Sequence, residues 1–198
     1  MGRLLTMVAA LGLLLYPFLV YLGISHGGSG WALILLGLFA LRFWPGASPK
    51  LREWLWLGRT LAGVGVALTL LTLLCRDPLW LLYYPVVVNL LLLALFAWSL
   101  GQPRSLVERL ARLQDPQLPA AAIPYTRRVT QIWCGFFLLN GTLALATVLW
   151  GDMALWSLYN GLLSYLLMAT LMAGEWLVRR RVQARLSHNG QCSEDSPC

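Results

Sequence analysis

The sequence contains little charge. Only 12% of its 198 residues are Asp, Glu, Lys or Arg, and 59% are hydrophobic, whereas soluble proteins average about 25% charged residues. Together with a mean hydropathy of +0.67, this composition excludes an ordinary soluble domain. It also excludes a disordered chain, which needs low hydrophobicity and high net charge. We therefore predict an all-α protein, a polytopic transmembrane helical bundle.

Motifs of self-contained catalysis are absent as well. The sequence has no Walker lysine loop, GxSxG, HExxH or dinucleotide fingerprint, which weighs against a self-sufficient enzyme without excluding an intramembrane one. Its four cysteines form no CxxC pair, which argues against a disulfide framework and against a zinc site. We expect no metal and no other cofactor.

Acidic residues number 8 against 15 basic ones, which gives a formal net charge of +7. In a soluble protein this excess would suggest nucleic acid. Here the basic residues lie between apolar runs, so we expect no nucleic-acid partner. We attribute the excess to membrane topology and to contact with anionic lipid headgroups.

About six spans are predicted from the apolar runs, since one spanning helix needs about 20 apolar residues. The predicted spans cover residues 4–24, 31–44, 54–75, 79–100, 129–150 and 154–178. Residues 1–186 form one transmembrane domain in this interpretation, and residues 187–198 form a disordered cytoplasmic tail.

The basic residues are distributed asymmetrically about these spans. Six spans place both termini and two of the connecting loops on one side, with 14 of the 15 basic residues, and leave only Arg76 on the other. The positive-inside rule then predicts that both termini are cytoplasmic.

The longest polar stretch lies between the fourth and fifth predicted spans. Ser105 and Glu108 have the spacing of a helix capping box. Three leucines then share one helical face: Leu106, Leu110 and Leu113. We predict a short amphipathic helix that lies in the membrane interface.

Polar residues inside the spans are the default functional candidates, because an unpaired polar group in lipid is costly. Asn89 and Asn140 both fall near the bilayer midplane, where their amides can bind each other or line a substrate path. Asn160 is predicted to form a similar clamp between helices, nearer the non-cytoplasmic surface of the membrane. Arg59 and Glu175 lie near the cytoplasmic ends of their spans and can form an ion pair, although Glu175 can also pair with Arg179 at i+4.

Five arginines form a second candidate site, for lipid headgroups or a phosphorylated carrier, although positive-inside anchoring also explains them. They are Arg104, Arg109, Arg112, Arg127 and Arg128. Tryptophans are predicted to form an interfacial belt. Those near predicted span ends are Trp31, Trp44, Trp54, Trp56, Trp80, Trp98, Trp150, Trp156 and Trp176.

Several segments between residues 82 and 181 resemble a known family. They are ERLARL (108–113), LP (118–119), YTRRVTQIWCGFF (125–137), NG (140–141), WSLYNG (156–161) and GEWLVRRR (174–181). The chain resembles uncharacterised small bacterial inner-membrane proteins that are encoded with fatty-acid-synthase-like genes for aryl polyene and xanthomonadin-type pigments. No catalytic residues transfer from that family.

The resemblance implies a multi-pass inner-membrane accessory protein, a scaffold or transport helper of polyene-lipid assembly. Its partners would be membrane lipids and an acyl carrier protein or acyltransferase of the same pathway. Two alternatives stay open. One is a membrane-embedded acyl or glycosyl transferase that uses Glu175 or His26, and the other is a small transporter with Asn89 and Asn140 in its path.

Overall fold

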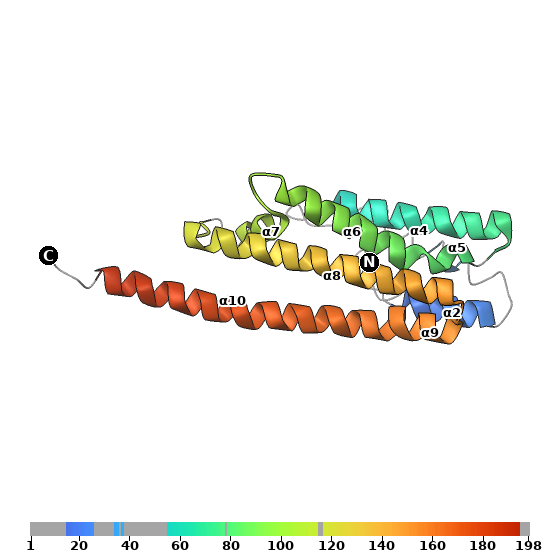
Figure 1. The fold of residues 1–198 in the computed structure, drawn as a ribbon. Coiled ribbons are helices and arrows are strands. Elements are labelled where there is room, and N and C mark those ends of the chain that lie inside the picture. Colours follow the sequence, from blue (N-terminus) through green and yellow to red (C-terminus); the bar gives the residue numbers. More distant parts are fainter. Residues whose placement is uncertain are drawn as a thin grey trace, which may run out of the picture. The chain divides into compact units, whose positions relative to one another are not determined.

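The structure is a computed structural model, and it describes residues 15–25, 34–35, 37, 55–77, 79–114 and 117–194 (Figure 1). Within these ranges all regular secondary structure is helical, as the composition predicts, and no strand occurs. The elements follow in the order α2 (Tyr16–Ser25), α4 (Leu55–Cys75), α5 (Leu79–Leu82), α6 (Tyr84–Leu100), α7 (Leu106–Gln114), η2 (Ala120–Ala122), α8 (Ile123–Trp150), α9 (Met153–Leu158), η3 (Tyr159–Leu163) and α10 (Ser164–Glu194).

Three stretches of helix in the described part of the chain are long and apolar enough to cross a membrane: Leu79–Leu100, Ile123–Trp150 and Met153–Arg180. They correspond to the last three predicted spans. The apolar helix at Tyr16–Ser25 and the apolar stretch Arg59–Cys75 are shorter and fall in the first and third predicted spans. The second predicted span lies almost wholly outside the described residues. A membrane protein is therefore supported, and the count of six spans stays a prediction.

Helix is the expected conformation for these apolar runs, because a bilayer offers no water to backbone N–H and C=O groups. Hydroxyl side chains inside the helices bind carbonyls of the preceding turn, so they need no partner elsewhere. In α8, for example, Thr130 Oγ1 donates to the Thr126 carbonyl at 2.9 Å and Thr147 Oγ1 donates to the Ala144 carbonyl at 2.7 Å. Helix α8 begins at Ile123, earlier than predicted, because Pro124 occupies the first turn, where proline is tolerated.

The chain divides into two compact units, Met1–Leu162 and Leu163–Cys198. The second unit consists of α10 together with its flanking residues. This helix continues through residues 187–194, where the sequence predicts a disordered tail. No proline interrupts the chain between Pro124 and Pro197, so nothing there breaks the series of i→i−4 hydrogen bonds.

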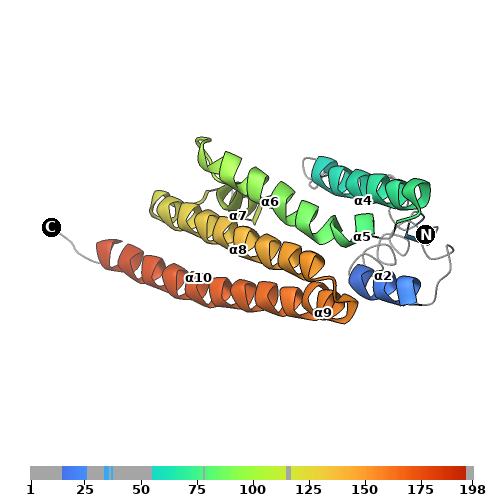
Figure 2. The same cartoon turned by 45° about the vertical axis from the view of Figure 1, so that its right-hand side comes forward.

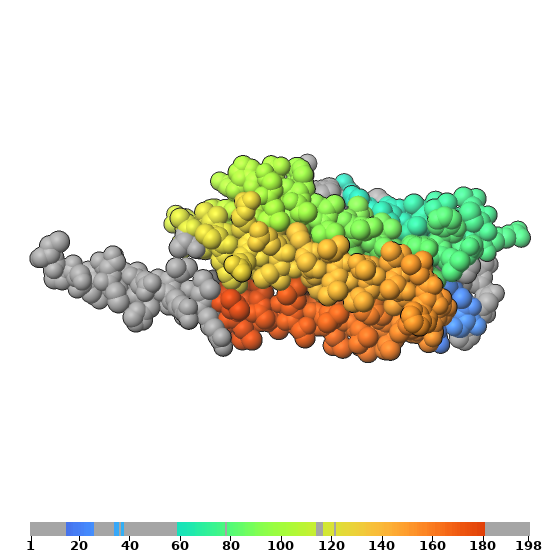
Figure 3. Space-filling model, in the orientation of Figure 1, coloured from blue at the N-terminus to red at the C-terminus, as the bar shows by residue number. Residues whose placement is uncertain are grey.

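Within the first unit, α6 and α8 form the most extensive helix pair and lie side by side (Figure 2). Their directions are opposite, because Asn89 contacts Asn140, Phe96 contacts Phe137, and the Leu100 carbonyl accepts from Arg127. In the space-filling view, the side chains of the two helices meet along a continuous surface (Figure 3).

The predicted amphipathic helix is α7, which packs against α8 and the end of α6. Leu106, Glu108 and Ala111 are buried against the protein, whereas Leu110 and Leu113 of the predicted leucine face are exposed. The capping box forms in part. Ser105 Oγ accepts from the Glu108 N–H at 3.4 Å, while the Glu108 carboxylate turns to Arg112 Nε at 2.9 Å.

Candidate functional site

The first candidate site lies at a break in the fourth predicted span. The helix is interrupted at Tyr83 between α5 and α6, and Pro85 lies in the first turn of α6. Proline has no N–H to donate to the carbonyl four residues earlier, which is that of Leu81. In an apolar interior the freed carbonyls of this turn require other donors.

Two aromatic side chains supply these donors. The Tyr16 hydroxyl donates to the Leu81 carbonyl, and the Trp156 indole Nε1 donates to the Leu82 carbonyl at 3.1 Å. Tyr16 is 2% exposed and Trp156 is 1% exposed, so both belong to the core of the first unit. The prediction that Trp156 is an interfacial belt residue is therefore wrong. Its indole is held inside because its N–H has a buried partner. Trp80, Trp98, Trp150 and Trp176 are exposed, as belt residues would be.

The two asparagines predicted to lie near the bilayer midplane contact each other, which is the first of the two alternatives that the sequence leaves open. Asn140 Nδ2 donates to Asn89 Oδ1 at 3.1 Å, and Asn89 Nδ2 donates to the Pro85 carbonyl at 2.8 Å. The Tyr159 hydroxyl donates to Asn140 Oδ1 at 2.8 Å. We call Pro85, Asn89, Asn140 and Tyr159 the polar chain. It joins α6, α8 and the π-helical segment η3, and its three side chains are buried.

Asn160 forms a separate clamp, also as predicted. Its Nδ2 donates to Thr147 Oγ1 of α8 at 3.2 Å and to the Trp156 carbonyl at 2.9 Å. Asn160 lies in η3, where the wider π-helical turn displaces backbone hydrogen bonds. Among the described residues, every buried side-chain nitrogen and oxygen atom has a hydrogen-bond partner.

Close helix contact at the polar chain depends on Gly141. A Cβ atom built on this residue would lie 3.0 Å from Asn89 Cβ. The short distance allows the two asparagine amides to meet across α6 and α8, since small residues let helix backbones approach closely. No sequence pattern distinguishes Gly141 from the other glycines of this span as the residue at the helix contact.

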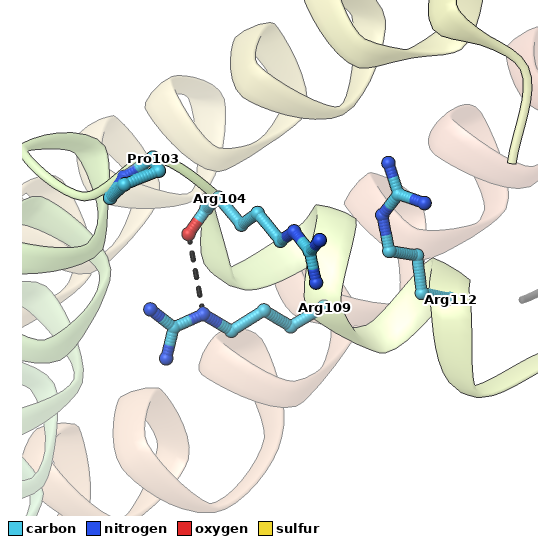
Figure 4. A pocket seen from close by; sticks show the side chains of 4 residues that line it. All are labelled: Pro103, Arg104, Arg109 and Arg112. Carbon is cyan, nitrogen blue, oxygen red and sulfur yellow. Dashed lines mark hydrogen bonds between the residues drawn. The ribbon is translucent and has the colours of Figure 1, made fainter.

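The second candidate site is the cationic end, which we define as Arg104, Arg109, Arg112, Arg127 and Arg128. The first three line a shallow open hollow of about 620 Å³ together with Pro103 (Figure 4). We call it the arginine hollow. Arg109 Nε donates to the Arg104 carbonyl at 3.3 Å, and Arg112 Nε contacts the carboxylate of Glu108, which is 3% exposed. The loop after α6 and α7 thus supply three arginines to the lining of one hollow.

Arg127 has a different role, because its Nη2 donates to the Leu100 carbonyl at the C-terminus of α6, at 2.6 Å. The last carbonyls of a helix lack intrahelical partners, and a cation there is favoured by the helix dipole. Arg127 therefore joins the start of α8 to the end of α6. Arg128 is exposed on the next position of α8.

Arg59 and Glu175, which are predicted to form an ion pair, belong to different units of the chain. Arg59 is exposed on α4 in the first unit, whereas Glu175 lies on α10 in the second. Their ion pair stays a prediction. On α10 the Arg180 guanidinium stacks on the Trp176 ring at 4.0 Å from its centroid. His26 lies outside the described residues.

The two sites offer different chemistry. The polar chain consists of neutral amide and hydroxyl groups that bind one another and clamp helices together. The cationic end consists of charged donors suited to an anion. In the described ranges, no three His, Cys, Asp or Glu side chains gather as they would around a metal ion.

The sequence did not identify Tyr16 as a donor to the Leu81 carbonyl, Tyr159 as a donor to Asn140, or Glu108 as the partner of Arg112. A helix-breaking proline inside a span is the signal that could have prompted a search for buried donors.

Compared with known proteins, this chain matches no family model, no curated protein and no solved structure.

Proposed function

We propose that this protein is a multi-pass inner-membrane accessory protein that holds anionic components of a polyene-lipid pathway at the cytoplasmic membrane surface. The pathway assignment rests on the sequence resemblance. The cytoplasmic side rests on the asymmetric distribution of basic residues. The components would be membrane lipids and an acidic acyl carrier protein or acyltransferase.

One observation carries the proposal, namely the gathering of arginines where α6 ends and α8 begins. Arg104, Arg109 and Arg112 share a hollow, and Arg127 fixes the adjacent helix ends to each other. A cationic surface at the end of apolar helices attracts anionic groups within about a Debye length of the membrane. Such a surface can retain partners without any catalytic group of its own.

Support for scaffolding over transport comes from the polar chain. The amides of Asn89 and Asn140 bind each other, the Pro85 carbonyl and the Tyr159 hydroxyl. A substrate passing this level would have to replace those hydrogen bonds with its own. The bonds therefore favour a structural role for these asparagines.

The test is a clean deletion in the native host, with polyene pigment measured separately in inner- and outer-membrane fractions. We expect total pigment to fall, and we expect the full-length chain to restore it. Complementation with Arg109→Gln/Arg112→Gln/Arg127→Gln/Arg128→Gln should fail although the variant inserts. Complementation with Asn89→Leu, checked for insertion in the same way, should succeed.

Three other results have distinct meanings. Pigment that is made but retained in the inner membrane would assign the protein to export. Loss of pigment after a single change at Glu175 or His26, with normal insertion, would favour a membrane-embedded enzyme. Unchanged pigment in both fractions of the deletion strain would refute the link to the pathway.

A further inference from the structure

We propose that the arginine hollow, with the exposed leucines of α7 beside it, binds the phosphate of an anionic phospholipid. The inference rests on the proposed function, because it names the anionic component that the cationic end holds. The ligand is an amphiphile, with a phosphate among the guanidinium groups and acyl chains against Leu110 and Leu113.

The charge of the hollow calls for an anion with several acceptor oxygens. Arg109 uses its Nε on the Arg104 carbonyl and Arg112 uses its Nε on Glu108, which leaves the terminal nitrogens of both for a ligand. No described residue accepts a hydrogen bond from the exposed Arg104 side chain in this structure. Guanidinium groups bind phosphate through parallel N–H donors, which makes arginine better suited than lysine to this task.

The buried carboxylate orients one arginine of the hollow. Glu108 is 3% exposed and bound to Arg112, so it neutralises one guanidinium from the protein side and presents little negative charge to the opening. The Arg104 carbonyl holds Arg109 in place from the loop. Two of the three arginines are thus oriented by contacts within the loop and α7.

The apolar flank distinguishes a lipid from a soluble anion. Leu110 and Leu113 are 41% and 53% exposed on the same short helix, although its contact face buries Glu108. A helix that buries a carboxylate and exposes leucines is stabilised when an apolar neighbour covers those leucines. Because α7 joins the ends of two candidate spans, that neighbour is the acyl-chain boundary of the bilayer.

The test uses the full-length protein in detergent micelles and native mass spectrometry. The probe is an equimolar mixture of phosphatidylglycerol and phosphatidylcholine with the same acyl chains. We expect phosphatidylglycerol to be retained about tenfold or more over phosphatidylcholine, because both lipids carry the phosphate but the choline cation of phosphatidylcholine repels the guanidinium groups. Arg104→Gln/Arg109→Gln should abolish this preference. Leu110→Asn/Leu113→Asn should weaken retention of both lipids.

The matched control is Arg59→Gln/Arg76→Gln, which removes the same net charge outside the hollow and should keep the preference. An equal loss in the control would mean that overall charge is responsible and would overturn the site. Displacement of phosphatidylglycerol by millimolar inorganic phosphate would assign the hollow to a free anion instead. Lipid preference unchanged in Arg104→Gln/Arg109→Gln, with loss of binding to a purified acidic acyl carrier protein, would make it a protein-docking surface and refute the lipid.

The two proposals fail separately. In one case the Arg104→Gln/Arg109→Gln variant loses the lipid preference, but deletion of the protein leaves pigment unchanged. That result would support the lipid site and refute the link to the pathway. Absence of any lipid preference, with pigment lost in the deletion strain, would remove the lipid site and keep the pathway.

Discussion

The indole Nε1 of Trp156 donates a hydrogen bond of 3.1 Å to the backbone carbonyl of Leu82, 74 positions earlier in the chain. This carbonyl belongs to the last residue of α5 and lies at the break between α5 and α6. It places a large aromatic residue in the core of the first unit, beside Tyr16. The consequences of this bond, and of the polar chain, can be measured.

Replacing Trp156 by Phe should lower the free energy of unfolding by about 1–3 kcal/mol, because a buried carbonyl loses its donor. Trp150→Phe is the matched control. Trp150 is 78% exposed at the end of α8, so this change should have little effect. Unfolding of the full chain in mixed micelles, followed by circular dichroism as the denaturing detergent increases, measures both. Equal stability of the two variants would contradict the assigned bond.

The contact between Asn89 and Asn140 should appear as a coupling energy in a double-mutant cycle. We expect the Asn89→Ala and Asn140→Ala changes to couple by about 0.6–1.7 kcal/mol, between the average and the largest value measured for hydrogen bonds between membrane helices. Thr142 is exposed and its hydroxyl binds the Leu138 carbonyl of its own helix. The cycle of Asn89→Ala with Thr142→Ala should therefore give a coupling near zero. Similar values in both cycles would show that the asparagine contact is absent.

Gly141→Ala should destabilise the α6–α8 pair by about 1–3 kcal/mol, since overpacking at a close contact forces backbones apart. The added methyl would lie 3.0 Å from Asn89 Cβ, an atom that no side-chain rotation removes. Gly135 in the same helix has no atom within 4 Å of the position that an added methyl would take. Gly135→Ala should be neutral or stabilising by up to about 1 kcal/mol, because alanine favours helix. The same unfolding measurement compares the two, and a reversed order would refute the close approach.

The predicted topology can be tested with the chain's own cysteines. Cys75 is exposed at the end of α4, beside Arg76 on the side predicted to face away from the cytoplasm, and Cys192 lies near the C-terminus, which is predicted to be cytoplasmic. A membrane-impermeant maleimide should label a variant retaining only Cys75 while the inner membrane is intact. It should label one retaining only Cys192 after that membrane is opened. A variant retaining only Cys134, inside α8, should react poorly in both states. Labelling of Cys75 and Cys192 from one side would mean an even number of spans between them, against the three that we predict.

The sequence determined the class of protein and the location of its long helices, because a run of about 20 apolar residues is stable as a helix in lipid whatever surrounds it. It also paired Asn89 with Asn140, since residues at equal depth in antiparallel spans can meet and polar groups in lipid need partners. The arginines of the cationic end were visible as well, because charge is excluded from the spans.

Only the tertiary structure decided which faces of the helices are buried and which donors fill the break at Pro85. These spans are apolar all round, so no stripe of hydrophobic residues marks an inner face as it does in a soluble helix. The partners Tyr16 and Trp156 lie 65 and 74 positions from the carbonyls that they bind. Local patterns carry no information over that distance, so contacts of this kind depend on how the helices pack.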